Sequence, residues 1–274
     1  MKGLVKLSSL SFVAGTFSSL LGVGGGLILV PTLMSYRVPF FKSTGTALTT
    51  IPLVAFVGFL FEVTFVFLIA GEFDFTSLSL WRLPFFLALG GFIGVFFGAN
   101  FFERLSTLIL RKIFILILII SMIKNLYEGL TFETGAVFSP AGNSAKLLLA
   151  GTLKHYVVCI ALGFIAGISA ISLGIGGGLL VVPGLTFFIP EIPISLACSI
   201  SLAAMIPTSL VASLKAKQQD RVDSYYFSRI IIFCLIGACF GCFLRLAVLD
   251  YHYLYFIFAG FLFYAVLRLR SSGQ

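Results

Sequence analysis

The sequence Phe12-Val-Ala-Gly-Thr-Phe-Ser-Ser-Leu-Leu-Gly-Val-Gly-Gly-Gly-Leu-Ile-Leu-Val-Pro31 recurs 152 residues later as Phe164-Ile-Ala-Gly-Ile-Ser-Ala-Ile-Ser-Leu-Gly-Ile-Gly-Gly-Gly-Leu-Leu-Val-Val-Pro183, with eleven of twenty positions identical. After a two-residue insertion in the later copy, Gly45-Thr-Ala-Leu48 aligns with Ser199-Ile-Ser-Leu202. Self-similarity of this length indicates an internal duplication. We therefore predict two homologous membrane repeats, 1–126 and 156–274. A linker at 127–155 joins them, and its middle contains the turn-forming residues Pro140, Gly142 and Asn143.

The composition shows which solvent surrounds the repeats. Of 274 residues, 59% are hydrophobic and 10% are charged, whereas a water-soluble domain carries roughly 25% charged residues. We count eight apolar segments, several of them as long as the roughly 20 residues that span a bilayer. This excludes a soluble enzyme and predicts an all-α polytopic membrane protein in a lipid bilayer. The net charge of +8 is scattered over short loops, which argues against nucleic-acid binding.

Four glycines within five residues interrupt an apolar run in each repeat: Gly22, Gly24, Gly25 and Gly26, then Gly174, Gly176, Gly177 and Gly178. Each glycine inside a helix costs about 1 kcal/mol relative to alanine, so the clusters should open their helices. We predict that each repeat begins with such a glycine-broken segment, formed by half-helices or a re-entrant hairpin, and continues with three transmembrane helices. Irregular backbone survives in a membrane only inside protein or beside a wet cavity.

These breaks are candidate substrate-binding sites. A half-helix that begins at Gly26 or Gly178 turns free N–H groups and the positive end of its dipole toward the middle of the membrane, where they can bind a small anion. Among the nearby hydroxyls, Thr46 and Ser201 lie in equivalent stretches and are added to the eight glycines as candidate ligands. The alternative for the glycines is close helix packing or a hinge.

Packing is the better explanation for the other glycines. Gly90, Gly94 and Gly98 recur every four residues, as do Gly237 and Gly241, and this spacing lets two helix backbones approach each other. In the repeat alignment Gly90 and Gly94 correspond to Gly237 and Gly241.

Glu62 is the main acidic residue inside an apolar run, with nineteen uncharged residues before it. An acid at such depth is a candidate for proton or cation coupling, and a place at the membrane interface is the alternative. Arg245 is interpreted as a snorkelling anchor rather than a substrate contact. Cys239 and Cys242 form a Cys-x-x-Cys pair in an apolar helix without a second pair or a nearby His, so packing is favoured over zinc or redox chemistry. No catalytic, metal or cofactor site is predicted.

The chain resembles the TauE/SafE family of sulfite exporters and anion permeases. The resemblance rests on Leu21-Gly-Val-Gly-Gly-Gly-Leu-Ile-Leu-Val-Pro31 and its second copy, Leu173–Pro183, with support from the stretches that end at Asp74 and Asp223 and from Leu110-Arg111. It implies a multi-pass transporter of the inner or plasma membrane for small anions such as sulfite, sulfoacetate or thiosulfate. Three residues depart from the family pattern: Ala47, Ser199 and Ile200.

The orientation depends on whether the glycine-broken segments cross the membrane. If both cross, twelve basic residues lie on the side of the termini and six lie opposite; if both are re-entrant, the division is thirteen to five. Both cases predict cytoplasmic termini. We predict a secondary carrier that works by alternating access, with an anion channel or a sulfur-handling enzyme using Cys239 and Cys242 as alternatives. The sequence leaves open the anion, the direction, the coupling ion and the oligomeric state.

Overall fold

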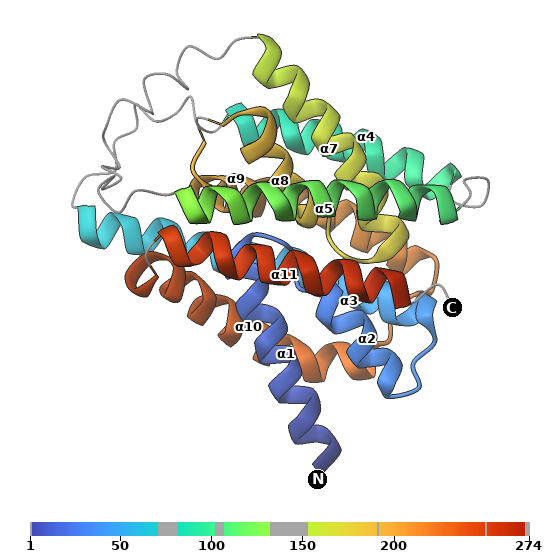
Figure 1. The fold of residues 1–274 in the computed structure, drawn as a ribbon. Helices are drawn as coiled ribbons and strands as arrows, with labels where there is room; N and C mark the ends of the chain where they lie inside the picture. The colour runs from blue at the N-terminus through green and yellow to red at the C-terminus, as the bar shows by residue number, and fades with distance from the viewer. Residues whose placement is uncertain are drawn as a thin grey trace.

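The structure is a computed structural model that describes residues 2–70, 82–101, 107–131, 153–190, 192–249 and 251–271. Throughout these ranges the regular structure is helical (Figure 1). The helices are α1 (Lys2–Leu21), α2 (Gly26–Ser35), α3 (Phe40–Ala70), α4 (Arg82–Phe101), α5 (Thr107–Thr131), α7 (Leu153–Leu173), α8 (Gly178–Phe188), α9 (Ile194–Gln218), α10 (Ser224–Phe243), the π-helical turn η2 (Leu244–Val248) and α11 (Tyr251–Ser271).

Five stretches in the described ranges are long and apolar enough to cross a membrane: Phe40–Phe65, Arg82–Ala99, Leu153–Ser172, Ile194–Gln218 and Ser224–Val248. The prediction of an all-α, multi-pass membrane protein is therefore confirmed. Most of the predicted linker lies outside the described residues, although α5 continues to Thr131 and α7 begins at Leu153. Asp74 also lies outside them. The boundaries of the two repeats remain a prediction.

Both glycine clusters interrupt their helices at the predicted place. Helix α1 ends at Leu21 and α2 begins at Gly26, whereas α7 ends at Leu173 and α8 begins at Gly178. The break contains three glycines with positive φ in each half: Gly22, Gly24 and Gly25, then Gly174, Gly176 and Gly177. A side chain rarely adopts this backbone conformation, so the glycines are needed for the turn.

Each broken segment forms a helical hairpin, in which the second helix packs beside the first. In the first, Leu7 near the start of α1 shares one hydrophobic cluster with Leu33 near the end of α2, so α2 runs back along α1. In the second, a Cβ on Gly184 of α8 would lie 2.5 Å from the Leu162 side chain of α7.

The two halves are interlocked because each packs its first helix against a helix of the other half. A Cβ on Gly94 of α4 would lie 2.1 Å from the carbonyl oxygen of Phe164 in α7, and one on Gly237 of α10 would lie 2.2 Å from that of Phe12 in α1. The predicted packing role of these glycines is confirmed. Since Phe12 and Phe164 are equivalent, Gly94 corresponds to Gly237, and the sequence alignment of this helix was wrong by one turn.

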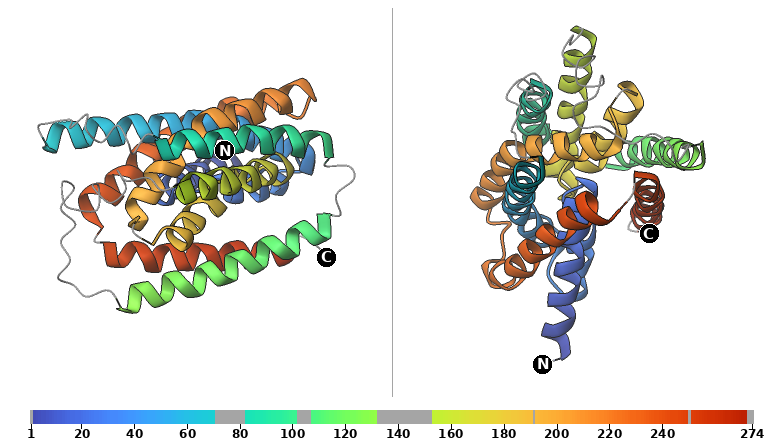
Figure 2. Two further views of the ribbon diagram at one scale, coloured as in Figure 1. Left: turned by 90° about the horizontal axis from the view of Figure 1, so that it is seen from above. Right: turned by 90° about the vertical axis from the view of Figure 1, so that its left-hand side faces the viewer.

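Helices α3 and α9 lie antiparallel between the hairpins. The start of α3 meets the end of α9, where the amide of Asp223 donates to Thr46 Oγ1 at 2.9 Å. At the other end of α3, Ser199 near the start of α9 donates to Glu62. The halves thus run in opposite directions through the membrane. Helices α5 and α11 form a separate pair at one side of this arrangement (Figure 2).

Candidate functional site

The two glycine loops pack directly against each other between the middle of α3 and the middle of α9. A Cβ on Gly26 would lie 2.0 Å from the carbonyl oxygen of Gly174, and one on Gly178 would lie 2.2 Å from that of Gly22. The flanking contacts also match, since Gly24 meets Met205 of α9 while Gly176 meets Ile51 of α3. Each contact in one half has a counterpart in the other, at the positions that the sequence repeat makes equivalent.

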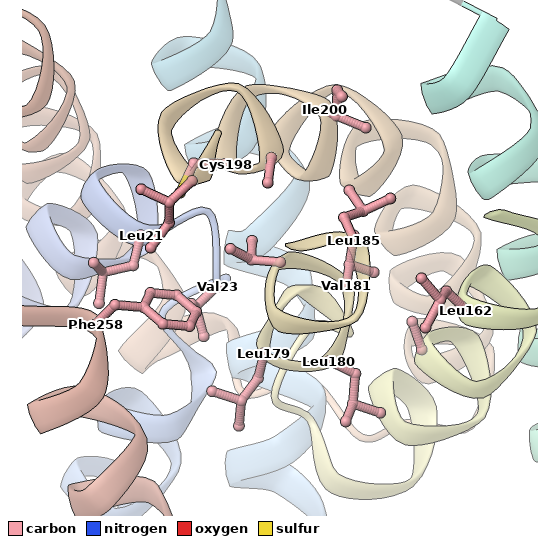
Figure 3. Packing of buried hydrophobic residues seen from close by; sticks show 14 of the residues in the cluster. Leu21, Val23, Leu162, Leu179, Leu180, Val181, Leu185, Cys198, Ile200 and Phe258 are labelled. Atoms are coloured by element: carbon pink, nitrogen blue, oxygen red, sulfur yellow. The ribbon is translucent and has the colours of Figure 1, made fainter. Parts of the chain in front are cut away.

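Apolar side chains surround the loops. The cluster around the first loop includes Leu21 and Val23, which face Leu179 of α8 and Phe258 of α11 (Figure 3). Val23 and Phe258 are fully buried. The loops are therefore enclosed by protein, as irregular backbone in a membrane requires.

The packing of the loops places opposite helix ends together. The N-terminus of α2, at Gly26, touches the carbonyl that follows the end of α7, and the N-terminus of α8, at Gly178, touches the carbonyl that follows the end of α1. Helix N-termini carry partial positive charge and C-termini partial negative charge, so each pair of ends attracts. In this conformation the two positive ends face carbonyls of the other half rather than each other.

Several loop amides have no hydrogen-bond acceptor. The amides of Gly26 and Gly178 donate within their own loops, to the carbonyls of Gly24 and Gly176. Within the described part of the chain, the amides of Gly24, Gly25, Gly176 and Gly177 donate no backbone hydrogen bond. These four donors remain the best candidates for contact with an anion.

A narrow hollow of about 160 Å³ lies inside the first hairpin, beside Gly25. It is too constricted for a water molecule, and its lining is mostly apolar. Ser18 and Thr50 are the polar side chains in this lining; the Thr50 hydroxyl donates to the Ala47 carbonyl, whereas the buried Ser18 hydroxyl has no partner among the described groups. The space would have to widen before it could admit an anion.

The two predicted hydroxyl ligands lie in different places. Ser201 reaches the first loop, where its hydroxyl donates to the carbonyl of Gly22 at 2.8 Å. Thr46 instead donates to the carbonyl of Lys42 and accepts from the amide of Asp223. The structure therefore brings Ser201 to the loops and places Thr46 at the start of α10.

Near the first loop the structure contains a buried ion pair between Glu62 of α3 and Arg245 of η2. Arg245 Nη2 lies 2.7 Å from Glu62 Oε2, and the residues are 4% and 8% exposed. Ser199 donates to the other carboxylate oxygen, and Arg245 Nη1 donates to the carbonyl of Ser19 at 3.2 Å. The snorkelling interpretation of Arg245 is wrong, because its side chain turns into the protein and is ion-paired.

The sequence identifies Glu62 as a candidate coupling residue, but it does not identify Arg245 and Ser199 as the partners of Glu62. Arg245 lies 183 residues away from it, and only the exchange of helices between halves brings the two together. One feature of the sequence does point to Arg245, because a basic residue inside a membrane span is energetically unfavourable unless it has a partner. The π-helical turn that carries Arg245 could not be read from the sequence, although such turns are frequent at functional sites.

The two thiols of the Cys-x-x-Cys pair have different surroundings in the structure. Both thiols are free, Cys242 is buried, and its thiol donates to the carbonyl of Gly58 at 3.2 Å. Within the described residues there is no group of three or more His, Cys, Asp or Glu side chains that could hold a metal ion.

Spanning helices with two opposed, glycine-broken hairpins describe a multi-pass membrane protein of the transporter type. The family model described as "Sulfite exporter TauE/SafE" matches residues 1–125 and 159–274, nearly the whole chain. The chain belongs to this family of membrane transporters for sulfite and other anions. Comparisons with curated proteins and with solved structures found no match.

Proposed function

We propose that this protein is a secondary carrier that moves small sulfur-containing anions, of the sulfite, sulfoacetate and thiosulfate class, by alternating access. The observation that carries the proposal is the direct packing of the two glycine-broken loops against each other. Opposed broken helices of this kind form the midplane substrate sites of transporters built from inverted repeats.

In this proposal the anion binds to the free amides of the glycine clusters when the loops separate. The amides of Gly24 and Gly25 approach from one half and those of Gly176 and Gly177 from the other, while Gly22, Gly26, Gly174 and Gly178 shape the turns. Ser201 contributes a hydroxyl beside the first loop. The packed loops are then the occluded, empty state, in which helix ends of opposite sign close on each other.

Basic residues support one orientation in the membrane. With both hairpins re-entrant, thirteen of the eighteen Lys and Arg residues lie on the face that carries both termini. We therefore propose a protein of the cell membrane with cytoplasmic termini. The Glu62–Arg245 pair is then on the outer side of the loops.

Counterflow in liposomes tests the proposal. Vesicles with purified protein and internal sulfite, thiosulfate or sulfoacetate should take up the same labelled anion in a saturable manner and discriminate against chloride. Gly25→Val should abolish this uptake, since Gly25 has a positive φ and its Cβ would lie 3.1 Å from the Ala14 carbonyl. Gly260→Val is the control, because nothing lies within 4 Å of its Cβ. Unsaturable conductance would indicate a channel instead.

A further inference from the structure

Stability alone does not explain why Glu62 and Arg245 form a buried ion pair. Taking two charges out of water is expensive, and a hydrophobic pair of similar size is often at least as stable. A charged pair inside a membrane-spanning segment is therefore a functional-site candidate, with its partner known here. The pair lies about 16 Å along α3 from Ile51, which contacts Gly176 of the second loop, and it is therefore on the side of the first loop.

Arg245 has donor capacity that its present partners do not use. Its Nη1 donates to the Ser19 carbonyl and its Nη2 faces Glu62, whereas its Nε has no acceptor in the described part of the chain. A guanidinium presents five donors in a planar fork that suits an oxyanion. Glu62 therefore occupies the place that a small oxyanion would take.

The pair is also connected to the first glycine loop. Ser19 precedes Gly22 by one helical turn, and a Cβ on Gly22 would lie 2.8 Å from the carbonyl oxygen of Cys198. The next residue, Ser199, donates to Glu62. An anion that leaves the loop toward this face would thus meet Arg245 first.

The geometry points to Arg245 as an anion-binding residue whose internal counter-ion, Glu62, exchanges with the substrate when Glu62 takes up a proton. This inference rests on the proposed function and adds its coupling ion. With Glu62 ionised, the carboxylate neutralises Arg245 and excludes the anion. With Glu62 protonated, Arg245 needs a new counter-ion, and the anion supplies it, so one proton and one anion are bound together.

Ser199 can serve both protonation states of Glu62. Its hydroxyl lies within hydrogen-bond distance of Glu62 and of the Ser195 carbonyl, 3.1 Å away. When Glu62 is ionised, the hydroxyl donates to the carboxylate. When Glu62 is protonated, its own O–H donates to Ser199 Oγ, and the Ser199 proton turns to the Ser195 carbonyl. The added proton therefore finds a hydrogen-bond acceptor at Ser199.

The other titratable groups near the pair are thiols and a phenol. Cys198 of α9 and Cys242 of α10 lie beside the two charges, and Tyr255 of α11 lies next to Cys198. The other described titratable or charged groups on the packed helices lie toward the helix ends: Lys6 on α1, Lys42 on α3, Lys154 and His155 on α7, Lys215 and Lys217 on α9, Arg229 on α10, and His252, Arg268 and Arg270 on α11. Glu62 is the carboxylate that pairs with Arg245 in the described part of the chain.

Proton-coupled thiosulfate transport tests this inference, because thiosulfate keeps one charge state over the working range of about pH 5 to 8. Liposomes with a trapped pH indicator should show about one proton moved per thiosulfate for the wild-type protein, with apparent affinity rising as the pH falls. Glu62→Gln should retain thiosulfate exchange but lose both the proton movement and the pH dependence. Arg245→Gln should weaken thiosulfate binding roughly 10- to 100-fold.

Controls separate folding from function. Lys217→Gln removes an exposed positive charge from the far end of α9 and should behave as wild type. If Glu62→Gln does not fold, the double variant Glu62→Gln/Arg245→Gln removes both charges, and it should move no protons with thiosulfate.

Three outcomes would overturn the inference alone. They are Glu62→Gln with wild-type proton stoichiometry, Arg245→Gln with wild-type thiosulfate affinity, and a double variant that still couples protons to thiosulfate. A wild-type protein that carries none of the three sulfur anions would instead contradict the proposed function, and this inference would fall with it.

Discussion

The two ends of the glycine-loop assembly have the same backbone but different chemistry. At one end the first loop meets α9, where Ser199 lies opposite Glu62. At the other end the second loop meets α3 around Thr44, and the equivalent residues are Gly45 and Ala216. A Cβ on Gly45 would lie 2.2 Å from the carbonyl of Arg221, so backbone fills the space that the carboxylate and hydroxyl occupy at the first end.

An arginine is present near the second end too, but in a different setting. Arg221 lies in the turn before α10 and donates to Thr44 Oγ1 at 2.9 Å. Partial burial lowers the pKa of Arg221, and no carboxylate in the described ranges forms an ion pair with it. The two hairpins therefore share one backbone arrangement. A few different side chains are enough to make the two ends of the glycine-loop assembly chemically unequal.

Breaking the ion pair should have the largest effect on stability. Arg245→Met leaves the buried Glu62 carboxylate without its partner, and we expect a loss of about 3–5 kcal/mol in the free energy of unfolding. Glu62→Met/Arg245→Met removes both charges and should recover most of this loss. Denaturant unfolding in detergent micelles measures both, with Lys217→Met as an exposed control. If Arg245→Met were as stable as the wild-type protein, the ion pair would contribute little to stability, and the end that contains it would not differ energetically from the end at Arg221.

The contact between the loops should respond equally from both sides. Gly26→Ala and Gly178→Ala each place a Cβ about 2 Å from a carbonyl oxygen, and overpacking of this kind costs about 1–3 kcal/mol. Thermal unfolding of the two variants should give similar losses. Gly260→Ala, in an open part of α11, should cause none. A loss confined to one of the two loop variants would show that the apparent symmetry does not extend to the energetics.

The features that could be predicted from the sequence are local ones. Four glycines in five residues break a helix wherever they occur, so the ends of α1 and α7 were found. Glycines at every fourth residue pack closely against some helix, so the role of Gly94 and Gly237 was also found. Because such a stripe matches itself after one turn, the alignment of α4 with α10 slipped by four residues.

The features that could not be predicted depend on how distant segments meet. Hydropathy alone does not say whether a broken segment turns back, whereas the structure packs α2 beside α1. Arg245 reaches Glu62 because α10 packs beside α3 and a π-helical turn directs the side chain inward. Neither the helix exchange nor the turn has a sequence signal comparable to the glycine clusters.

Ser201 offers a smaller test of the difference between the two loops. Its hydroxyl donates to the Gly22 carbonyl at 2.8 Å, whereas the equivalent residue, Ala47, offers the second loop no such donor. Ser201→Ala should destabilise the protein by about 1 kcal/mol. Ala47→Ser should supply the second loop with the missing bond and raise stability, or leave it unchanged if the buried site is too tight. Thermal unfolding checks both, and a clear loss from Ala47→Ser would mean that the loops are less alike than their backbones.

Cys239 should have the smallest effect, and it tests whether thiols contribute to the asymmetry. The residue is free and partly exposed on α10, one turn before the buried Cys242. Since it contacts neither the ion pair nor the loops in any described interaction, Cys239→Ala should change the free energy of unfolding by less than about 0.5 kcal/mol. Sulfite counterflow should also stay at the wild-type rate. If the Cys239→Ala protein folds but shows no sulfite counterflow, the activity depends on thiol chemistry at Cys239 rather than on the charges of Glu62 and Arg245.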